Sequence, residues 1–169
     1  MSLAAALLAE IDHEAGLTRR VLDRIPEDKL SWKPHEKSFS LGDLAWHIAL
    51  TPAQVADAAV PDVFRIDEFK QPDTPEAKDE ILAEFDKSIV TAKRYLDGLD
   101  DETAMATWKV IVQGKELMSL PRIDFLRGTM FNHLYHHRGQ LTVYLRLLDV
   151  PVPAIYGPSA DEPPYPPEG

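Results

Sequence analysis

The stretch TPEAKDEILAEFDKSIVTAKRYLDGL, residues 74–99, has the clearest structural pattern in this chain. Its apolar residues recur at intervals of three or four, which is typical of a helix that packs on one side. Thr74 and Pro75 suit the first turn of such a helix, and Gly98 suits its end. The apolar face contains Ile81, Leu82, Phe85, Ile89, Ala92, Tyr95, Leu96 and Leu99. We therefore expect a helix over residues 74–99.

Three further stretches, residues 3–25, 40–60 and 121–148, have the same helical periodicity. No run alternates apolar and polar residues for long enough to indicate a sizeable sheet, so the predicted fold class is all-α. The predicted connections are about 12–20 residues long, which exceeds the 2–8 usual in simple antiparallel bundles. The order of the helices in the bundle is therefore open on these grounds.

Local signals refine the predicted helix boundaries. Ser40 and Asp43 have nearly the spacing of a capping box, which favours a helix start at residue 40. Pro52 is expected to kink or restart that helix, because proline lacks a backbone N–H. Gly128 and Gly139 weaken the last helix, at a cost of about 1 kcal/mol each relative to alanine.

Two segments lie outside this helical pattern. Residues 108–117 contain three consecutive β-branched residues followed by Gly114, which is compatible with a short hairpin or with a packed loop. Residues 150–169 hold seven of the fourteen prolines, so this tail should be extended, with Tyr156 and Tyr165 as candidate anchors. We expect one bundle over residues 1–150 and a tail over 151–169 that packs on it or trails from it.

Composition excludes several classes of function. The 169-residue chain has 28 acidic and 18 basic residues and a formal charge of -10, which disfavours binding to nucleic acid or anionic lipid. Its longest uncharged apolar stretch, residues 3–9, is far below the ~18 residues that span a bilayer. We therefore expect a cytoplasmic protein with a small-molecule partner. Because the chain has no cysteine, a bound metal would need histidine or carboxylate ligands.

The histidines are the chain's main chemical resource, and three of them fall within five residues. The i, i+4 pair His133 and His137 can present two imidazoles to one cation, and the i, i+3 pair of His133 with His136 is the alternative. Helical geometry places His137 about 20° from the centre of the apolar stripe, His133 about 60° away and His136 about 120° away. We therefore expect His133 and His137 to face the core and His136 the rim. The competing interpretation is two polar residues with ordinary hydrogen bonds.

The remaining histidines and one glutamate are less clearly placed by periodicity. His47 lies about 110° from the stripe centre of its helix, which makes it a flank residue. His13 and His35 are expected on the surface. Glu14 falls within the apolar stripe of the first helix, where it would be either partly exposed at the stripe edge or a polar group that serves the site.

Two segments resemble a known family. The first comprises IPEDKLSWKP at residues 25–34, FSL at 39–41 and AWHI at 45–48, and the second comprises NHLYHHRGQL at 132–141 followed by YLR at 144–146. Together they are similar to the DinB/YfiT-like metalloproteins. The resemblance implies an up-down-down-up four-helix bundle that holds a divalent metal, commonly nickel or zinc, on three histidines.

Carried over by position, this resemblance makes His47, His133 and His137 the metal ligands, in place of the flank interpretation of His47. Relatives in this family include transferases and isomerases that use the thiols bacillithiol or mycothiol, while many members have no assigned reaction. We therefore expect a metalloenzyme. The resemblance suggests a thiol-dependent transferase, and the open coordination positions of a metal on three imidazoles suggest a hydrolase that activates water as the alternative.

Two hypotheses of function follow. In the first, a metal with open coordination positions binds a thiol or water, and Gln140 and Tyr144 position the substrate. In the second, the metal fastens helices together in a non-catalytic structural or binding protein, stress-related and dimeric. A pocket of a few hundred Å3 above the metal, open to solvent and containing water or a small acid, would favour the enzyme, and a dry, closed site would favour the structural protein.

Overall fold

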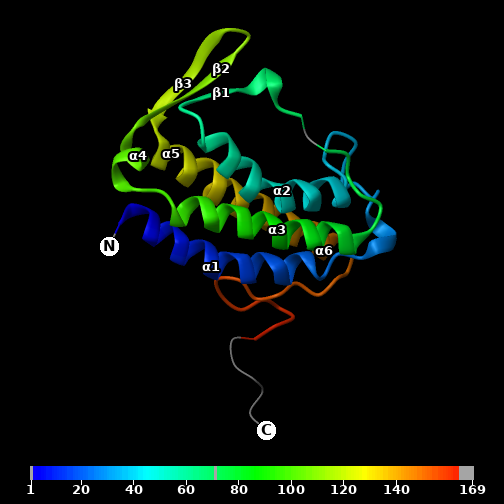
Figure 1. The fold of residues 1–169 in the computed structure, drawn as a ribbon. Coiled ribbons are helices and arrows are strands. Elements are labelled where there is room, and N and C mark those ends of the chain that lie inside the picture. The colour runs from blue at the N-terminus through cyan, green and yellow to red at the C-terminus, as the bar shows by residue number, and fades with distance from the viewer. Residues whose placement is uncertain (1, 71, 164–169) are drawn as a thin grey trace.

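The computed structural model describes residues 2–70 and 72–163. Its long helices are α1 (Leu3–Leu22), α2 (Leu41–Ala59), α3 (Lys78–Asp97) and α6 (His133–Leu147), which lie side by side (Figure 1). Helix α2 packs on α3 and α6, and α1 packs on the same two helices. The apolar faces of these helices meet in two buried clusters, and Ile89 and Tyr135 pack against both.

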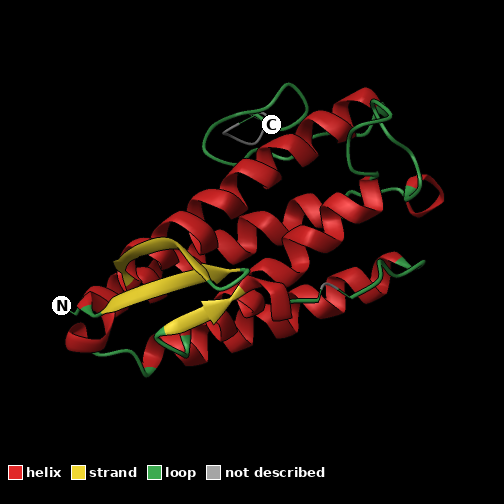
Figure 2. Cartoon of the chain, turned by 90° about the horizontal axis from the view of Figure 1, so that it is seen from above, coloured by secondary structure: helices red, strands yellow, loops and turns green. Residues whose placement is uncertain are grey.

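The protein is mostly helical, but it also has a small sheet of three strands, which the all-α prediction omitted. These strands are β1 (Val63–Arg65), β2 (Thr107–Val112) and β3 (Lys115–Pro121), and they lie across the end of the helices where α1 begins (Figure 2). Strand β2 is central, parallel to β1 and antiparallel to β3. Gln113 and Gly114 form the β2–β3 turn at φ 49° and 75°, so the hairpin alternative was the correct one.

A buried arginine ties this sheet to the helices. Arg122, at the start of the short helix α5 (Arg122–Phe125), is 1% exposed. It donates hydrogen bonds to the carbonyls of Ala59 at 2.8 Å and Thr103 at 2.6 Å, and to the Asp62 carboxylate at 2.5 Å. Thr103 belongs to the short helix α4 (Asp101–Met105). One side chain thus joins the end of α2 to the elements that flank the sheet.

The capping box of α2 is present, and it changes where α3 begins. The Ser40 hydroxyl accepts from the Asp43 N–H at 3.0 Å, and the Asp43 carboxylate accepts from the Ser40 N–H at 3.3 Å. The Thr74 hydroxyl donates to the same carboxylate at 2.7 Å. Because Thr74 serves α2 in this way, α3 starts at Lys78 rather than at residue 74.

Pro52 neither ends nor restarts α2, which runs from Leu41 to Ala59 around it. The Ala53 N–H donates to the Ser88 hydroxyl of α3 at 2.8 Å. The same hydroxyl donates to the Leu50 carbonyl at 3.4 Å. A side chain of the neighbouring helix therefore supplies hydrogen-bond partners for backbone groups next to the proline. The prediction of a restart was wrong because it considered local sequence only.

The last predicted helix is interrupted by a wider turn. Helix α5 leads into the π-helical segment η3 (Leu126–Asn132), where the His133 N–H bonds back to the Gly128 carbonyl, and then into α6. The buried residues of α6 are Leu134, Arg138, Leu141 and Leu145. His133 and His137 consequently lie on the flank of the buried stripe. The predicted phase was wrong because it assumed α-helical geometry through this segment.

The described part of the tail, residues 151–163, contacts α1 and α6. Glu162 accepts from Arg24 at 2.7 Å and also pairs with Arg20, while Asp161 pairs with Arg146. Tyr165, the second candidate anchor, lies outside the described residues. Among the helices of residues 2–70 and 72–163, none is long and apolar enough to cross a membrane.

Candidate metal centre

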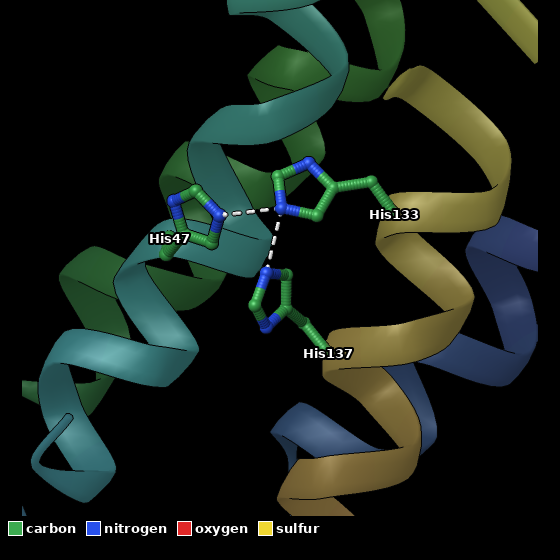
Figure 3. Close-up of side chains that lie close together, drawn as sticks. All are labelled: His47, His133 and His137. Atoms are coloured by element: carbon green, nitrogen blue, oxygen red, sulfur yellow. Dashed lines mark hydrogen bonds between the residues drawn. The ribbon is translucent and has the colours of Figure 1, made fainter. Parts of the chain in front are cut away.

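Helices α2 and α6 bring His47, His133 and His137 together, as Figure 3 shows. The Nε2 atom of His133 lies 3.3 Å from that of His47 and 2.6 Å from that of His137. One ligand atom from each of the three residues lies within 4.8 Å of the others. The i, i+4 spacing stacks two rings on one face of α6, and the packing of α2 on α6 supplies the third.

Neighbouring acceptors orient two of the rings. Gln140 Oε1 lies 2.7 Å from His137 Nδ1, so this nitrogen donates and Nε2 is left with its lone pair toward the cluster. The backbone carbonyl of Thr129 is a hydrogen-bond partner of the His133 ring, and this contact only partly offsets the burial that lowers the pKa of that ring. Thr129 lies in η3, where the backbone N–H of His133 bonds to the Gly128 carbonyl rather than to the Thr129 carbonyl. The π-helical turn therefore helps to position a ring of the cluster.

The three imidazoles are held in their neutral form. Burial, together with the neighbouring His137 and His133, lowers the pKa of His47 to about 4. Burial is also the main cause that lowers the pKa of His133 and of His137. Within the described part of the chain, no Asp or Glu belongs to the cluster. At neutral pH the site therefore offers uncharged nitrogen lone pairs, which is the state that binds a metal.

This donor set fits a divalent transition metal. Two nitrogens at 2.0–2.1 Å from a common ion lie about 2.9–3.4 Å apart. The separation of His47 from His133, 3.3 Å, is in this range, and that of His133 from His137, 2.6 Å, needs to widen slightly. Imidazole nitrogens suit zinc, nickel, copper or iron, and three ligands leave coordination positions open.

A cavity of about 280 Å3 adjoins the cluster, and both His47 and His133 belong to its wall. Strands β1 and β2, helices α2 and α5, the segment η3, the short helix η2 (Ile66–Glu68) and the adjoining Phe69 supply the rest of that wall. Most of the lining is apolar, including Val55, Phe64 and Trp108. This cavity was not predicted, because the sheet that closes it was not.

The other candidate residues lie apart from the cluster or serve it differently. His136 is exposed and stands outside it, and His13 and His35 are exposed as predicted. Gln140 contacts His137, which makes it a partner of a histidine of the cluster. The Tyr144 hydroxyl donates to the Phe39 carbonyl at 3.3 Å, and this tyrosine does not line the cavity.

Glu14 is buried rather than partly exposed, and its partner was missed. It is 5% exposed and Arg138 is 2% exposed, with Glu14 Oε2 and Arg138 Nη1 2.6 Å apart. Arg138 also donates to the Thr18 hydroxyl at 3.1 Å, and the Tyr156 hydroxyl donates to Glu14 at 2.8 Å. A signal was available, because Arg138 lies four residues after Leu134 on the buried stripe and carries the charge opposite to Glu14.

Comparisons with known proteins agree with this fold and show the family. The sequence model of the DinB family matches residues 1–168, so the chain belongs to the DinB family. The chain is 23% identical over 154 residues to the uncharacterized protein YrdA of Bacillus subtilis (strain 168), which covers 89% of this chain and 86% of YrdA.

Two crystal structures share the fold. A DinB-like protein from Bacillus cereus ATCC 10987 superposes with a TM-score of 0.69 at 24% identity, covering 88% of this chain and 95% of that one. The DinB-like protein YjoA from Bacillus subtilis also gives a TM-score of 0.69, at 21% identity, covering 85% of this chain and 92% of that one.

Proposed function

We propose that this DinB-family chain is a metalloenzyme that holds a divalent ion, nickel or zinc, on His47, His133 and His137. The observation that carries the proposal is the convergence of three neutral imidazoles beside a cavity of about 280 Å3. A metal bound there would lower the pKa of a coordinated thiol or water, and so generate a nucleophile at neutral pH.

The reaction that we propose is conjugation of a low-molecular-weight thiol with an electrophile. The thiol loses its proton, its sulfur lone pair forms a bond to an electrophilic carbon, and the electron pair displaced from that carbon leaves with a group or takes up a proton. The chain's own part is to hold the ion through the histidines, to orient His137 through Gln140, and to keep water from the reacting carbon.

Other features of the proposal follow from the same chemistry. The substrates are small molecules, and neither nucleic acid nor a membrane is involved. Low-molecular-weight thiols are kept reduced in the cytoplasm, which is where we place the protein. A homodimer is the assembly that we would test first, by light scattering of the metal-loaded protein.

The rival hypothesis is a metal site that only fastens α2 to α6. A site of that kind is normally closed by four protein ligands, whereas this cluster has three and adjoins a cavity. These two features favour the enzyme over the structural protein.

The decisive experiment measures metal content and rate on the same samples. Protein purified without chelator is expected to carry one equivalent of metal, and His47→Ala should lose most of it because His47 is the ligand that α2 supplies. A panel of thiols and electrophiles should react faster with wild type than with His133→Ala, and His13→Ala serves as the matched control. Equal rates with wild type and His133→Ala would favour the non-catalytic protein, and full occupancy in His47→Ala would remove this residue from the ligand set.

A further inference from the structure

The wall of the cavity beside the histidines is almost entirely carbon. Four aromatic side chains, Phe64, Phe69, Trp108 and Phe125, line it together with aliphatic residues. The Trp108 ring stacks on Phe125 with an angle of 14° between the ring planes, and on Phe64 with an angle of 16°. These flat rings form a wall suited to another flat, apolar group.

The polar atoms near this wall are largely committed to the protein. The Trp108 indole N–H donates to the Ala58 carbonyl at 3.0 Å, and the Thr51 hydroxyl donates to the His47 carbonyl at 2.6 Å. Apart from the two histidines, the remaining polar side chains of the lining are the uncharged Gln54 and Thr129. Among the described residues, none that lines the cavity is charged.

Charged side chains lie instead in a neighbouring hollow. That hollow shares Phe64 and Phe69 with the cavity but is lined by Arg65, Glu68 and Lys70. A carboxylate or ammonium group placed in the inner cavity would lose its water without gaining an ionic partner, which is strongly unfavourable. The arrangement therefore places an apolar cavity next to a hollow with charged side chains.

We propose that the cavity binds an uncharged, apolar group of the electrophile, of the size of a substituted benzene ring. A cavity of about 150 Å3 lined by aliphatic and aromatic side chains holds one benzene molecule. The volume here, about 280 Å3, leaves room for a ring with one or two substituents. This inference rests on the proposed function for its reaction, since the reacting carbon of the electrophile would then lie near His47 and His133, but the binding itself needs no metal.

The test uses toluene and its charged counterpart benzoate as probes of the metal-free protein. Binding is followed by the NMR resonance of the Trp108 indole N–H, assigned with Trp108→Phe. Toluene should shift this resonance in a saturable way, and benzoate should bind at least about tenfold more weakly because its charge would be buried unpaired. Equal or tighter binding of benzoate, or no saturable shift with toluene, would overturn the inference.

Variants locate the binding site. Ala58→Phe fills the cavity and Ile66→Glu places a charge in its lining, and each should weaken toluene binding by about tenfold or more. Ile66 is 44% exposed, so Ile66→Glu tests the site even if Ala58→Phe does not fold. Val90→Phe, at a position that is 55% exposed and outside the cavity lining, is the control and should bind toluene as wild type does. Unchanged affinity in folded Ile66→Glu would place toluene elsewhere and overturn the inference.

A second arm separates this inference from the proposed function. Cobalt(II)-loaded protein is titrated with benzyl mercaptan, whose sulfur at the metal stands in for the reacting atom and whose ring stands in for the apolar group, and with its charged counterpart 4-(mercaptomethyl)benzoate, whose carboxylate is too far from the sulfur to chelate the same ion. Thiolate coordination is followed by its charge-transfer absorption. Benzyl mercaptan should bind more tightly, and Ile66→Glu should remove this preference. If cobalt does not bind, the proposed function fails while the toluene result still decides the nature of the cavity. If cobalt binds but benzyl mercaptan has no advantage, the inference alone fails.

Discussion

His133, His136 and His137 lie close together in sequence, yet two of them join the cluster and one is exposed. The cause is angular, because the two rings on one face of α6 point at α2 while the ring of His136 is turned away. The hydrogen bond of His137 to Gln140 then holds the ring with Nε2 toward His133. A change of one residue in helical position therefore separates a histidine of the cluster from a surface histidine.

This difference leads to a direct prediction for paired variants. His137→Ala should lose most of its bound metal, because one of three ligand nitrogens is removed, whereas His136→Ala should retain it. Elemental analysis of the two purified proteins, prepared in parallel without chelator, measures the ratio of metal to protein. The reverse ranking would show that α6 is rotated relative to the arrangement described above.

At the scale of elements, the helices are held in place by polar groups that cross between them. Ser88 of α3 completes the backbone of α2 beside Pro52, Thr74 bonds to the cap of α2, and Glu14 of α1 pairs with Arg138 of α6. Each of these contacts sets the rotation or the end of a helix that carries a histidine or faces one. Polar pairing thus supplements the apolar core in positioning the site.

The cap of α2 should make stability depend on pH in a defined direction. Hydrogen bonding by the Ser40 side chain is the main cause that lowers the pKa of Asp43, and the Thr74 hydroxyl contributes. A carboxyl with a lowered pKa in the folded state stabilises the fold above its unfolded value of about 3.9 and loses this effect as pH falls through the folded pKa. Asp43→Ala should therefore cost about 1 kcal/mol at pH 7 and progressively less below about pH 4.

Urea unfolding of wild type and Asp43→Ala from pH 7 to pH 3 measures this difference. Asp73→Ala, which removes a nearby exposed carboxylate, is the control for the general loss of charge. A difference between wild type and Asp43→Ala that stays constant over the whole pH range would show that the carboxylate form has no special role in the cap.

Removing one member of the buried pair of Glu14 and Arg138 should lower the free energy of unfolding strongly, and replacing both members with apolar residues should lower it less than two separate losses would. Glu14→Ala leaves the Arg138 guanidinium buried with no carboxylate, and should lower the free energy of unfolding by about 3–5 kcal/mol. The double variant Glu14→Leu/Arg138→Leu removes both charges and should be less destabilised than the sum of the single variants Glu14→Leu and Arg138→Leu. Denaturant unfolding of the four proteins completes the cycle, and strictly additive losses would mean that the two charges do not interact.

At the scale of the whole molecule, the cluster connects two helices that are far apart in sequence. A metal that binds the native state and not the unfolded chain adds its binding free energy to stability. At a free metal concentration about 100 times Kd this is about 2.7 kcal/mol, or about 5–10 °C in Tm for a chain of this size.

Treatment with a chelator should therefore lower the Tm of metal-loaded wild type by about this amount. Calorimetry or thermal circular dichroism measures the midpoint, and elemental analysis verifies that the metal is gone. His137→Ala should show almost no response to the chelator, which separates metal loss from other effects of the reagent. An unchanged midpoint in verified metal-free wild type would mean that the metal has no part in folding.

The sequence by itself determined the main helices and the identity of the clustered histidines. Helical periodicity is local, so residues 74–99 contain nearly all the information that defines α3. Spacing and resemblance together indicated His47, His133 and His137, because the i, i+4 geometry of two ligands follows from the helix alone.

Only the tertiary structure decided the sheet, the π-helical segment and the cavity. Strand β1 pairs with β2 across more than forty residues, and such pairing is set by burial of the Trp108 face rather than by a local signal. The π-helical segment shifted the phase of α6 and placed the histidines on its flank, with Arg138 toward α1. The cavity forms where the sheet meets α2 and η3, so its volume and its apolar wall depend on contacts between segments that the sequence separates.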